Sequence, residues 1–121
     1  LRVFFAAATI RPVSYRLLVA RDPGLVCEDD GREPDDDRSN ASNLVSNTPV
    51  EGRVCPGAPD WYALRGVPAG NEVSLDLDFA DRLGDLDLEV YRPEATQPFL
   101  TAEGRGDGED LNFSAPFGGD F

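Results

Sequence analysis

Apolar and polar residues alternate with a period of two along much of this chain. In segment 73–80, Val, Leu, Leu and Phe alternate with Ser, Asp, Asp and Ala, and in 85–90 three acids alternate with Leu, Leu and Val. This period predicts two strands, each with one buried and one solvated face. Residues 81–84 between them are a short loop, so we expect the two strands to pair as a hairpin.

Shorter stretches of the same kind predict further strands. They are Leu1–Phe5, Tyr15–Val19, Trp61–Leu64 and Leu111–Phe113. Pro and Gly fall between these segments, and the single helical turn that we expect covers Ser39–Val45, capped by Asp37 or Ser39. Many short strands and almost no helix predict an all-β fold, an antiparallel β-sandwich.

Composition limits the size and the partners of this fold. The chain has 121 residues, enough for one domain, and its 23 acidic and 11 basic residues give a formal net charge of -12. Such a charge repels nucleic acid and anionic membranes and attracts cations. No apolar run approaches the length of a transmembrane helix, so no membrane insertion is expected. The sequence begins without an initiator Met or a signal peptide, and we expect a fragment or mature piece of something longer.

The two cysteines are the next feature. Cys27 and Cys55 each lie beside loop-forming residues, which favours a disulfide between them and an oxidising compartment; the alternative is two buried free thiols. A bridge closing a loop of this size would stabilise the fold by roughly 3–4 kcal/mol. The chain has no histidine, which excludes a Ser-His-Asp triad, zinc-His motifs and a Cys-His nucleophile.

The densest chemistry lies in an acidic loop, with seven carboxylates between Glu28 and Asp37. Gly31 and Pro34 exclude regular structure there. Converging carboxylates repel one another, and calcium relieves this repulsion because it takes about six to eight oxygen ligands. The spacing is not that of an EF-hand, so a solvated acidic loop remains the alternative to a calcium site.

A second acidic set lies on the predicted hairpin, where we expect four acids to share one face. They are Asp76, Asp78, Asp85 and Asp87. Like charges on facing strand positions are destabilising, which predicts a compensating arginine. The candidates are Arg65, Arg82 and Arg92. The alternative, a pair of glycosidase carboxylates, requires a concave cleft and one raised pKa.

Aromatic residues offer a possible binding surface. The candidates are Tyr15, Trp61, Tyr62 and Tyr91. If these side chains are exposed in one patch, they would form a platform for a ligand. For Trp61 and Tyr62 the alternative is packing in the core at the start of a strand.

Four ordered motifs between Cys27 and Leu111 resemble the bacterial pre-peptidase C-terminal (PPC) domain. Glu33-Pro-Asp-Asp36, with Ala41 and Leu44 after it, looks like the Glu-Pro-Asn-Asp-Ser opening of that family. Cys55-Pro-Gly-Ala-Pro-Asp-Trp-Tyr62 resembles its Asp-Trp-Tyr strand. Pro68-Ala-Gly70 and Gly84-Asp-Leu-Asp-Leu-Glu-Val-Tyr91 follow in the family's order.

The resemblance implies a jelly-roll-like sandwich and an accessory role. Members are appended to secreted proteases or arrayed on secreted bacterial proteins, and the relatives in clostridial collagenases bind collagen and hold calcium near the acidic opening. Carried over, Glu33, Asp35 and Asp36 fall on calcium-ligand positions, with Asp60 near another. Gly31 stands where those relatives have a further acid, and the substitute available in this chain is Asp30.

The two ends of the chain depart from the family pattern. The closing pair of strands is missing after residue 121, whereas residues 1–21 contain two segments that look like that pair. Residues 1–21 are then either the tail of a preceding tandem repeat or permuted strands of the same sandwich, whose main body is 22–121. In both cases we expect the front strands to dock in the vacant edge of this sandwich.

Three functions are compatible with these features. The first is a non-catalytic, calcium-stabilised accessory module of a secreted bacterial hydrolase or surface protein, located outside the cell or in the periplasm. Its partners would be adjacent domains of the parent protein, a protein fibre or a polysaccharide. The second is a structural spacer or intramolecular folding aid with no ligand beyond calcium. The third is a carboxylate-based hydrolase.

Overall fold

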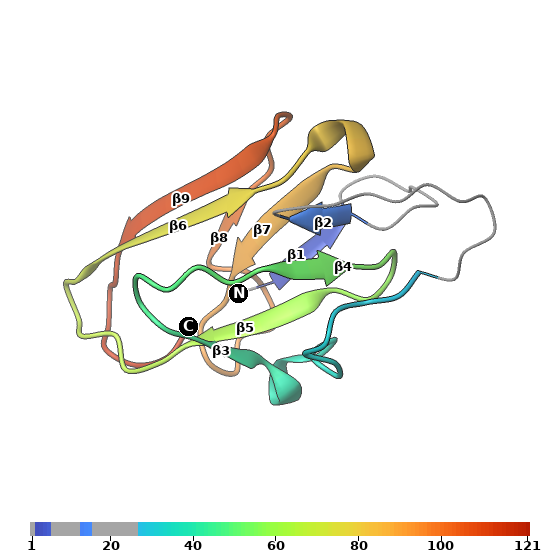
Figure 1. Cartoon of the computed structure of the whole chain (residues 1–121). Helices are drawn as coiled ribbons and strands as arrows, with labels where there is room; N and C mark the ends of the chain where they lie inside the picture. The colour runs from blue at the N-terminus through green and yellow to red at the C-terminus, as the bar shows by residue number, and fades with distance from the viewer. Residues whose placement is uncertain (1, 6–12, 16–26) are drawn as a thin grey trace.

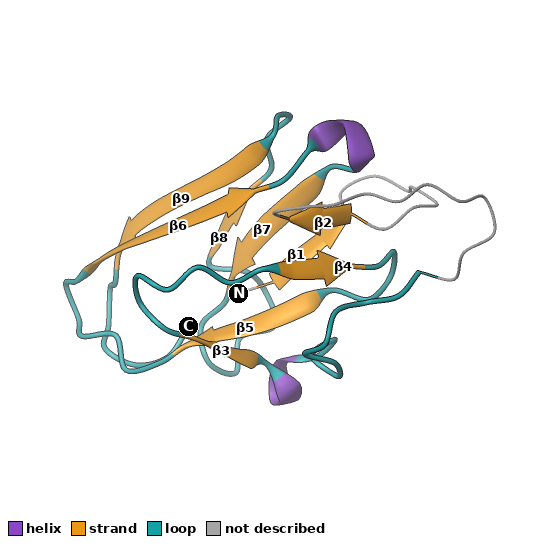
Figure 2. Ribbon diagram, in the orientation of Figure 1, coloured by secondary structure: helices purple, strands orange, loops and turns teal. Residues whose placement is uncertain are grey.

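The fold is all-β in the part of the chain that is described. The computed structural model describes residues 2–5, 13–15 and 27–121. Its strands are β1 (Arg2–Phe5), β2 (Val13–Tyr15), β3 (Ser42–Leu44), β4 (Gly52–Val54), β5 (Asp60–Leu64), β6 (Glu72–Asp78), β7 (Leu86–Val90), β8 (Leu100–Ala102) and β9 (Gly108–Ser114). Figure 2 shows that helix in these residues is confined to two short turns, η1 (Arg38–Asn40) and η2 (Asp81–Leu83). None of the described helices could span a membrane.

The strands form one larger and two smaller sheets. The larger sheet has five strands in the order β3-β5-β1-β7-β8, and two-stranded sheets are formed by β2 with β4 and by β6 with β9. All pairs are antiparallel except β3 with β5, which is parallel. Small, mostly antiparallel sheets are what the period-two pattern predicts.

The front strands are integrated into these sheets. β1 pairs on one side with β5, where Arg2 lies opposite Trp61, and on the other with β7, where Arg2 lies opposite Glu89 (Figure 1). It therefore takes a central position in the sheet and not the edge position that the sequence predicted. β2 pairs with β4, and residues 1 and 16–19 of the two predicted front strands lie outside the described residues.

The predicted hairpin is wrong, although both of its strands form. β6 pairs with β9 along its full length, from Glu72 opposite Ser114 to Asp78 opposite Gly108, whereas β7 pairs with β1 and β8. The connecting residues form the turn η2, in which the Leu83 amide donates to the Ala80 carbonyl at 2.8 Å. The chain thus leaves one sheet and enters another. Alternation specifies which face of a strand is buried, and it does not specify the neighbouring strand.

The helical turn and the shorter strands form near their predicted positions, but their lengths differ from the predicted lengths. Asp37 caps η1, because its carboxylate accepts from the amides of Ser39 at 2.8 Å and Asn40 at 3.3 Å. The turn ends at Asn40 and gives way to β3, so it is shorter than predicted. The expected strand at 61–64 is β5, and that at 111–113 is the longer β9.

One hydrophobic cluster joins the sheets. It contains alternate residues of β6, β7 and β9 together with residues of β4, β5 and the C-terminal segment: Val54, Tyr62, Val67, Val73, Leu77, Phe79, Leu86, Leu88, Val90, Leu111, Phe113, Ala115 and Phe121. Phe121 reaches this cluster because its amide and carbonyl both bond to Leu64, each at 2.9 Å. Burial of this apolar surface is the main contribution to stability.

The acids of β6 and β7 do not share a face, since the two strands are not paired. Asp76 lies opposite Asp110 of β9. Asp87 of β7 is only 6% exposed, and its Oδ1 has no hydrogen-bond partner. Burial, followed by the negative charges of Asp85 and Glu103, raises the pKa of Asp87 to about 6.

The predicted compensating arginines lie elsewhere. Arg65 pairs with Asp120 at 3.1 Å, and Arg92 lies over the rings of Phe99 and Phe117, at 4.9 Å from each centroid. The ion pairs between described residues join none of the three candidate arginines to the four acids. The charge of Glu89 on β7 is compensated by Arg2 at 3.2 Å, whereas the buried charge of Asp87 destabilises the fold.

Asp87→Asn is expected to stabilise the protein at neutral pH. Because the folded-state pKa of about 6 exceeds the ordinary value of 3.8, the folded state binds more protons than the unfolded state between these values. The free energy of unfolding therefore falls as pH rises through this window, and above it the charged carboxylate costs roughly 1–3 kcal/mol. Urea unfolding at about pH 4 and about pH 7 measures the effect, which should be larger at the higher pH. The control is Asp78→Asn on the exposed face of β6, and an equal effect of Asp87→Asn at both pH values would contradict the explanation.

Candidate metal centre

The acidic loop is fixed at its base by a disulfide. Cys27, which precedes the loop, is bonded to Cys55, which follows β4, and their Cα atoms are 6.0 Å apart. This confirms the pairing predicted from the sequence. A structural disulfide indicates an oxidising environment.

Two arginines hold the loop against β4. The Arg32 guanidinium donates to the Asp30 carboxylate at 3.1 Å and to the Glu51 carbonyl. The Arg53 amide donates to the same Asp30 carboxylate at 3.1 Å, and the Arg53 guanidinium donates to the Glu28 carbonyl at 2.9 Å. Asp30 is thus occupied by donors and serves to dock the loop.

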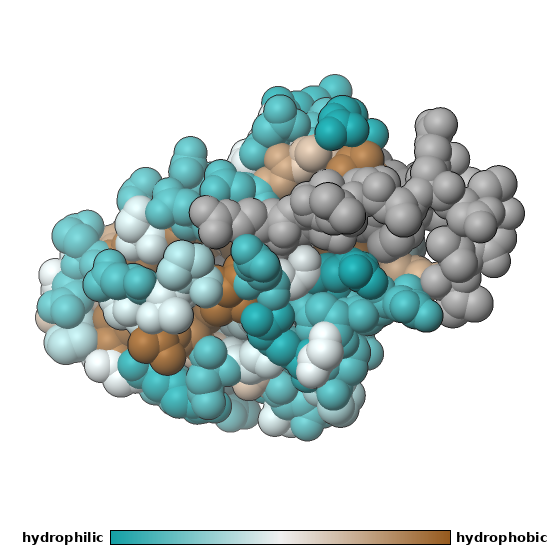
Figure 3. Space-filling model, viewed as in Figure 1, coloured by the Kyte–Doolittle hydropathy of each residue, from teal (hydrophilic) through white to brown (hydrophobic). Residues whose placement is uncertain are grey.

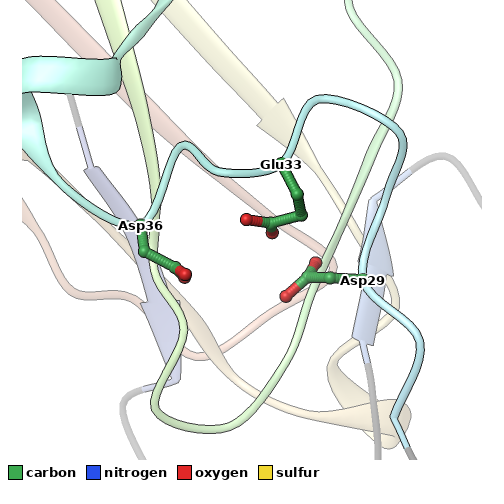
Figure 4. Close-up of side chains that lie close together, drawn as sticks. All are labelled: Asp29, Glu33 and Asp36. Atoms are coloured by element: carbon green, nitrogen blue, oxygen red, sulfur yellow. The ribbon is translucent and has the colours of Figure 1, made fainter.

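Two groups of three carboxylates converge above this base. One contains Asp29, Glu33 and Asp36, and the other contains Glu33, Asp35 and Asp60. Within each group, one oxygen from every residue lies within 4.8 Å of the others. Figure 4 shows the first group, in which the side chains of Asp29 and Glu33 point toward one another and Asp36 approaches from the opposite end of the loop. Glu33 belongs to both groups.

Two of the three acids in the second group are buried, whereas Glu33 is exposed. Asp35 and Asp60 are each 1% exposed. Asp60 is placed there by the start of β5, whose next residue, Trp61, donates its amide to the Asp35 carbonyl at 2.9 Å. The Asp35 Oδ2 accepts from the Ser42 hydroxyl at 3.1 Å, whereas its Oδ1 is buried without a hydrogen-bond partner. A buried carboxylate oxygen without a partner is costly and calls for an explanation.

The crowding of these acids shifts the pKa values of three of their carboxyl groups. Burial raises the pKa of Asp29, Glu33 and Asp35. Neighbouring negative charges raise each pKa further, those of Asp29 and Asp36 in the case of Glu33. A group with a raised pKa gains from a nearby cation, which favours its charged form. The site is therefore electrostatically suited to a positive ion.

The spacing of the carboxylate oxygens is compatible with a shared metal ion. Two oxygens bound to one calcium ion lie no more than about 5 Å apart, because each is about 2.3–2.6 Å from the ion. The spacing of at most 4.8 Å within each group meets this condition. Calcium takes about six to eight oxygen ligands, so carbonyl or water oxygens would have to complete a site that three carboxylates begin. These acidic groups are close enough to bind a metal ion.

The structure brings together most of the residues that the sequence selected. Glu33, Asp35, Asp36 and Asp60 all belong to one or both groups, whereas Asp30 does not. Asp29 was missed, although it is the direct neighbour of Asp30 in the sequence. Two adjacent acids in a loop point in different directions, and the sequence alone contains no signal for which of them faces the site.

Of the aromatic candidates, Trp61 and Tyr91 are partly buried and in contact with each other, whereas Tyr62 lies in the core. The rings of Trp61 and Tyr91 lie 5.1 Å apart, and the Arg38 guanidinium lies over both, at 5.1 Å and 4.7 Å from their centroids. Tyr62 is only 4% exposed and belongs to the core, which is the alternative that the sequence offered for it. The side chain of Tyr15 lies outside the described part of the structure.

No protein-family model, no curated protein and no solved structure matches this chain. The resemblance to the PPC family therefore rests on its four motifs. In the structure these motifs occupy the acidic loop, the segment that leads into β5, the turn before β6 and the strand β7.

Removal of the disulfide tests its part in holding the loop. The double variant Cys27→Ala and Cys55→Ala is expected to lose roughly 3–4 kcal/mol of unfolding free energy, since the bridge joins residues 28 positions apart. Urea unfolding of the variant and of the reduced wild-type chain measures this loss, and the two should agree. A double variant as stable as the oxidised wild type would show that the bridge contributes nothing to the fold.

Proposed function

We propose that this chain is a calcium-binding, non-catalytic accessory module of a secreted bacterial hydrolase or surface protein. The observation that carries the proposal is the buried Oδ1 of Asp35. This oxygen has no hydrogen-bond partner, and the Asp35 carboxylate to which it belongs lies in a group with those of Glu33 and Asp60. A calcium ion there would supply the missing partner and neutralise the converging charges.

The proposal includes membership of the PPC family and its jelly-roll-like sandwich. In support, the β6–β9 pair and the five-stranded sheet share one hydrophobic cluster, as two packed layers would. Two of the four motifs lie in the acidic loop and in the segment that leads into β5, whose first residue, Asp60, belongs to one acidic group. The disulfide supports an extracytoplasmic location, and secretion is part of the proposal.

Calcium would act as a structural clamp in this module. The two acidic groups draw ligands from the loop and from the first residue of β5, so that an ion would join the loop to the central part of the larger sheet. The loop is already held by Arg32, Arg53 and the disulfide, which reduces the entropy lost when the ion binds. The module would then present a rigid surface to adjacent domains, a protein fibre or a polysaccharide.

A non-catalytic role agrees with the chemistry of the chain. Without histidine the usual general base is missing, and the acids of β6 and β7 that could have formed a glycosidase pair lie on strands that do not pair. The acids that do converge have the close spacing of metal ligands. These features support a binding module over a hydrolase.

Calcium is expected to raise the thermal midpoint of the oxidised protein relative to a chelator. Calcium at a hundred times its dissociation constant would stabilise the fold by about 2.7 kcal/mol, a shift of roughly 10 °C for a domain near this size. Glu33→Gln should abolish most of the shift, because Glu33 belongs to both groups. Melting curves with calcium and with chelator measure the effect.

Two control variants make the result specific. Glu94→Gln makes the same chemical change at an exposed position outside the acidic loop and should keep the full shift. Asp30→Asn should lower the stability without calcium, because it weakens the bonds to Arg32 and Arg53, and should leave most of the calcium shift in place. The same midpoint with calcium and with chelator in the wild type would refute the metal site.

A further inference from the structure

A groove runs beside β6 on the face shown in Figure 3. Its volume is about 880 Å³, and its walls are β6, the loop that follows β3, and the end of β5 with the residues after it. Its lining includes the partly buried side chains of Leu44, Val50, Leu64 and Leu75, and that of Val45, which is 65% exposed. Brown hydrophobic surface is visible in the part of Figure 3 where Figure 1 places this loop. The groove is thus partly apolar and open to solvent.

The strand β6 presents its backbone to this groove. Among the described residues only β9 pairs with β6. In the continuation of that ladder the Asn71 carbonyl accepts from the Ala115 amide at 2.8 Å, and the Phe79 amide donates to the Asp107 carbonyl at 3.3 Å. Bonding groups alternate along an antiparallel strand, so odd-numbered residues of β6 direct their backbone groups to β9. The amides and carbonyls of the even-numbered residues point the other way, toward the groove.

Negative charge follows this edge. The even-numbered residues of β6 include Glu72, Asp76 and Asp78, all with exposed side chains on one face. Asp110 adds a further carboxylate opposite Asp76, and their contact raises the pKa of Asp76. The ion pairs between described residues include none of these four acids. The outer side of the groove therefore has uncompensated negative charge.

We propose that this groove binds an extended segment of a partner protein in which aliphatic residues alternate with lysine or arginine. The segment adds to β6 as a further strand, with its backbone bonded to the even-numbered residues of β6. Its aliphatic side chains face Leu75, Leu64 and Val50, and its basic side chains lie beside the acidic face of β6. This inference rests on the proposed function as a binding module and names the chemistry of its partner.

Charge complementarity and strand periodicity together select this occupant. A strand alternates its side chains between two faces, and here one face of the groove is apolar and the other is acidic. A peptide with all its basic residues at one end would meet the charge but not the apolar wall. An alternating acidic peptide would meet the apolar wall but be repelled by Glu72 and Asp76.

Labelled peptides of about nine residues, the length of a long strand, test the proposal by fluorescence anisotropy. A peptide of alternating valine and lysine should bind, while a block-scrambled peptide of the same composition and an alternating valine–glutamate peptide should each bind at least tenfold more weakly. Two N-methylated peptides, one modified at its odd and one at its even positions, should differ. Methylation of the amides that bond to β6 should abolish binding, and methylation of the amides that point away from β6 should be tolerated. Equal binding of the alternating and scrambled peptides would overturn the proposal, since it would indicate charge attraction only.

Protein variants locate the contact. Ser74→Pro removes an amide on the free edge of β6 and leaves the β9 ladder intact, so it should abolish peptide binding. Asp76→Asn should weaken binding several-fold, whereas Glu94→Gln makes an equal change of charge outside the groove and should not. If Ser74→Pro fails to fold, the N-methylated peptides test the same hydrogen bonds with the wild-type protein.

The calcium experiment separates failure of this inference from failure of the proposed function. If calcium raises the melting midpoint but no alternating peptide binds, the groove is refuted as a docking site while the proposed metal site is still supported. Peptide binding that Ser74→Pro and Asp76→Asn do not change would place the contact elsewhere, and would also refute the inference.

Discussion

The hydrogen bonds of the short strand β1 hold the largest sheet together. β1 lies between β5 and β7, and among the described strands each of these two has one further partner in the sheet. Val3 lies opposite Asp60, so that β1 also fixes the start of β5, where the buried part of the metal centre begins. The amide of the next residue, Trp61, then holds the backbone of Asp35. The position of the acidic loop therefore depends on a strand about thirty residues away in the sequence.

In the candidate metal centre, the arrangement that would favour ion binding also destabilises the protein when no ion is bound. Its carboxylates must converge to bind an ion, and convergence destabilises the protein without one because burial and mutual repulsion both disfavour the charged forms. Three contacts outside the clusters hold the loop in place: the disulfide at Cys27, the ion pair of Arg32 with Asp30, and the hydrogen bond that the Arg53 backbone amide donates to Asp30. The candidate site is thus preorganised by groups that lie outside the two carboxylate clusters, and in the proposed function calcium would relieve the remaining repulsion.

The sequence predicted the strands better than their arrangement. Alternation located β5, β6, β7 and β9, because burial of one face imposes a period of two on any strand. It could not assign β9 as the partner of β6, since pairing depends on contacts between residues far apart in the chain. The same limit applies to β1, whose central position between β5 and β7 has no local signal in residues 2–5.

For the candidate metal centre, too, the sequence predicted some features and not others. The structure places Glu33, Asp35, Asp36 and Asp60, which the sequence proposed as metal ligands, in two overlapping groups, and it confirms the disulfide that was predicted from the residues around each cysteine. The roles of Asp29 and Asp30 could not be distinguished, because the direction of a loop side chain depends on distant donors such as the Arg53 amide. The burial of Asp35 was equally hidden, since it results from packing against β5 and Ser42.

Terbium luminescence tests the central claim most directly. Terbium binds to calcium sites, and it emits when an indole close to it is excited. Trp61, the one tryptophan of the chain, directly follows the ligand candidate Asp60. The account predicts sensitised emission that calcium displaces, and that is lost in Asp35→Asn while the protein remains folded. Emission that is undiminished by Asp35→Asn, or no sensitised emission at all, would contradict a metal centre built on the buried carboxylates.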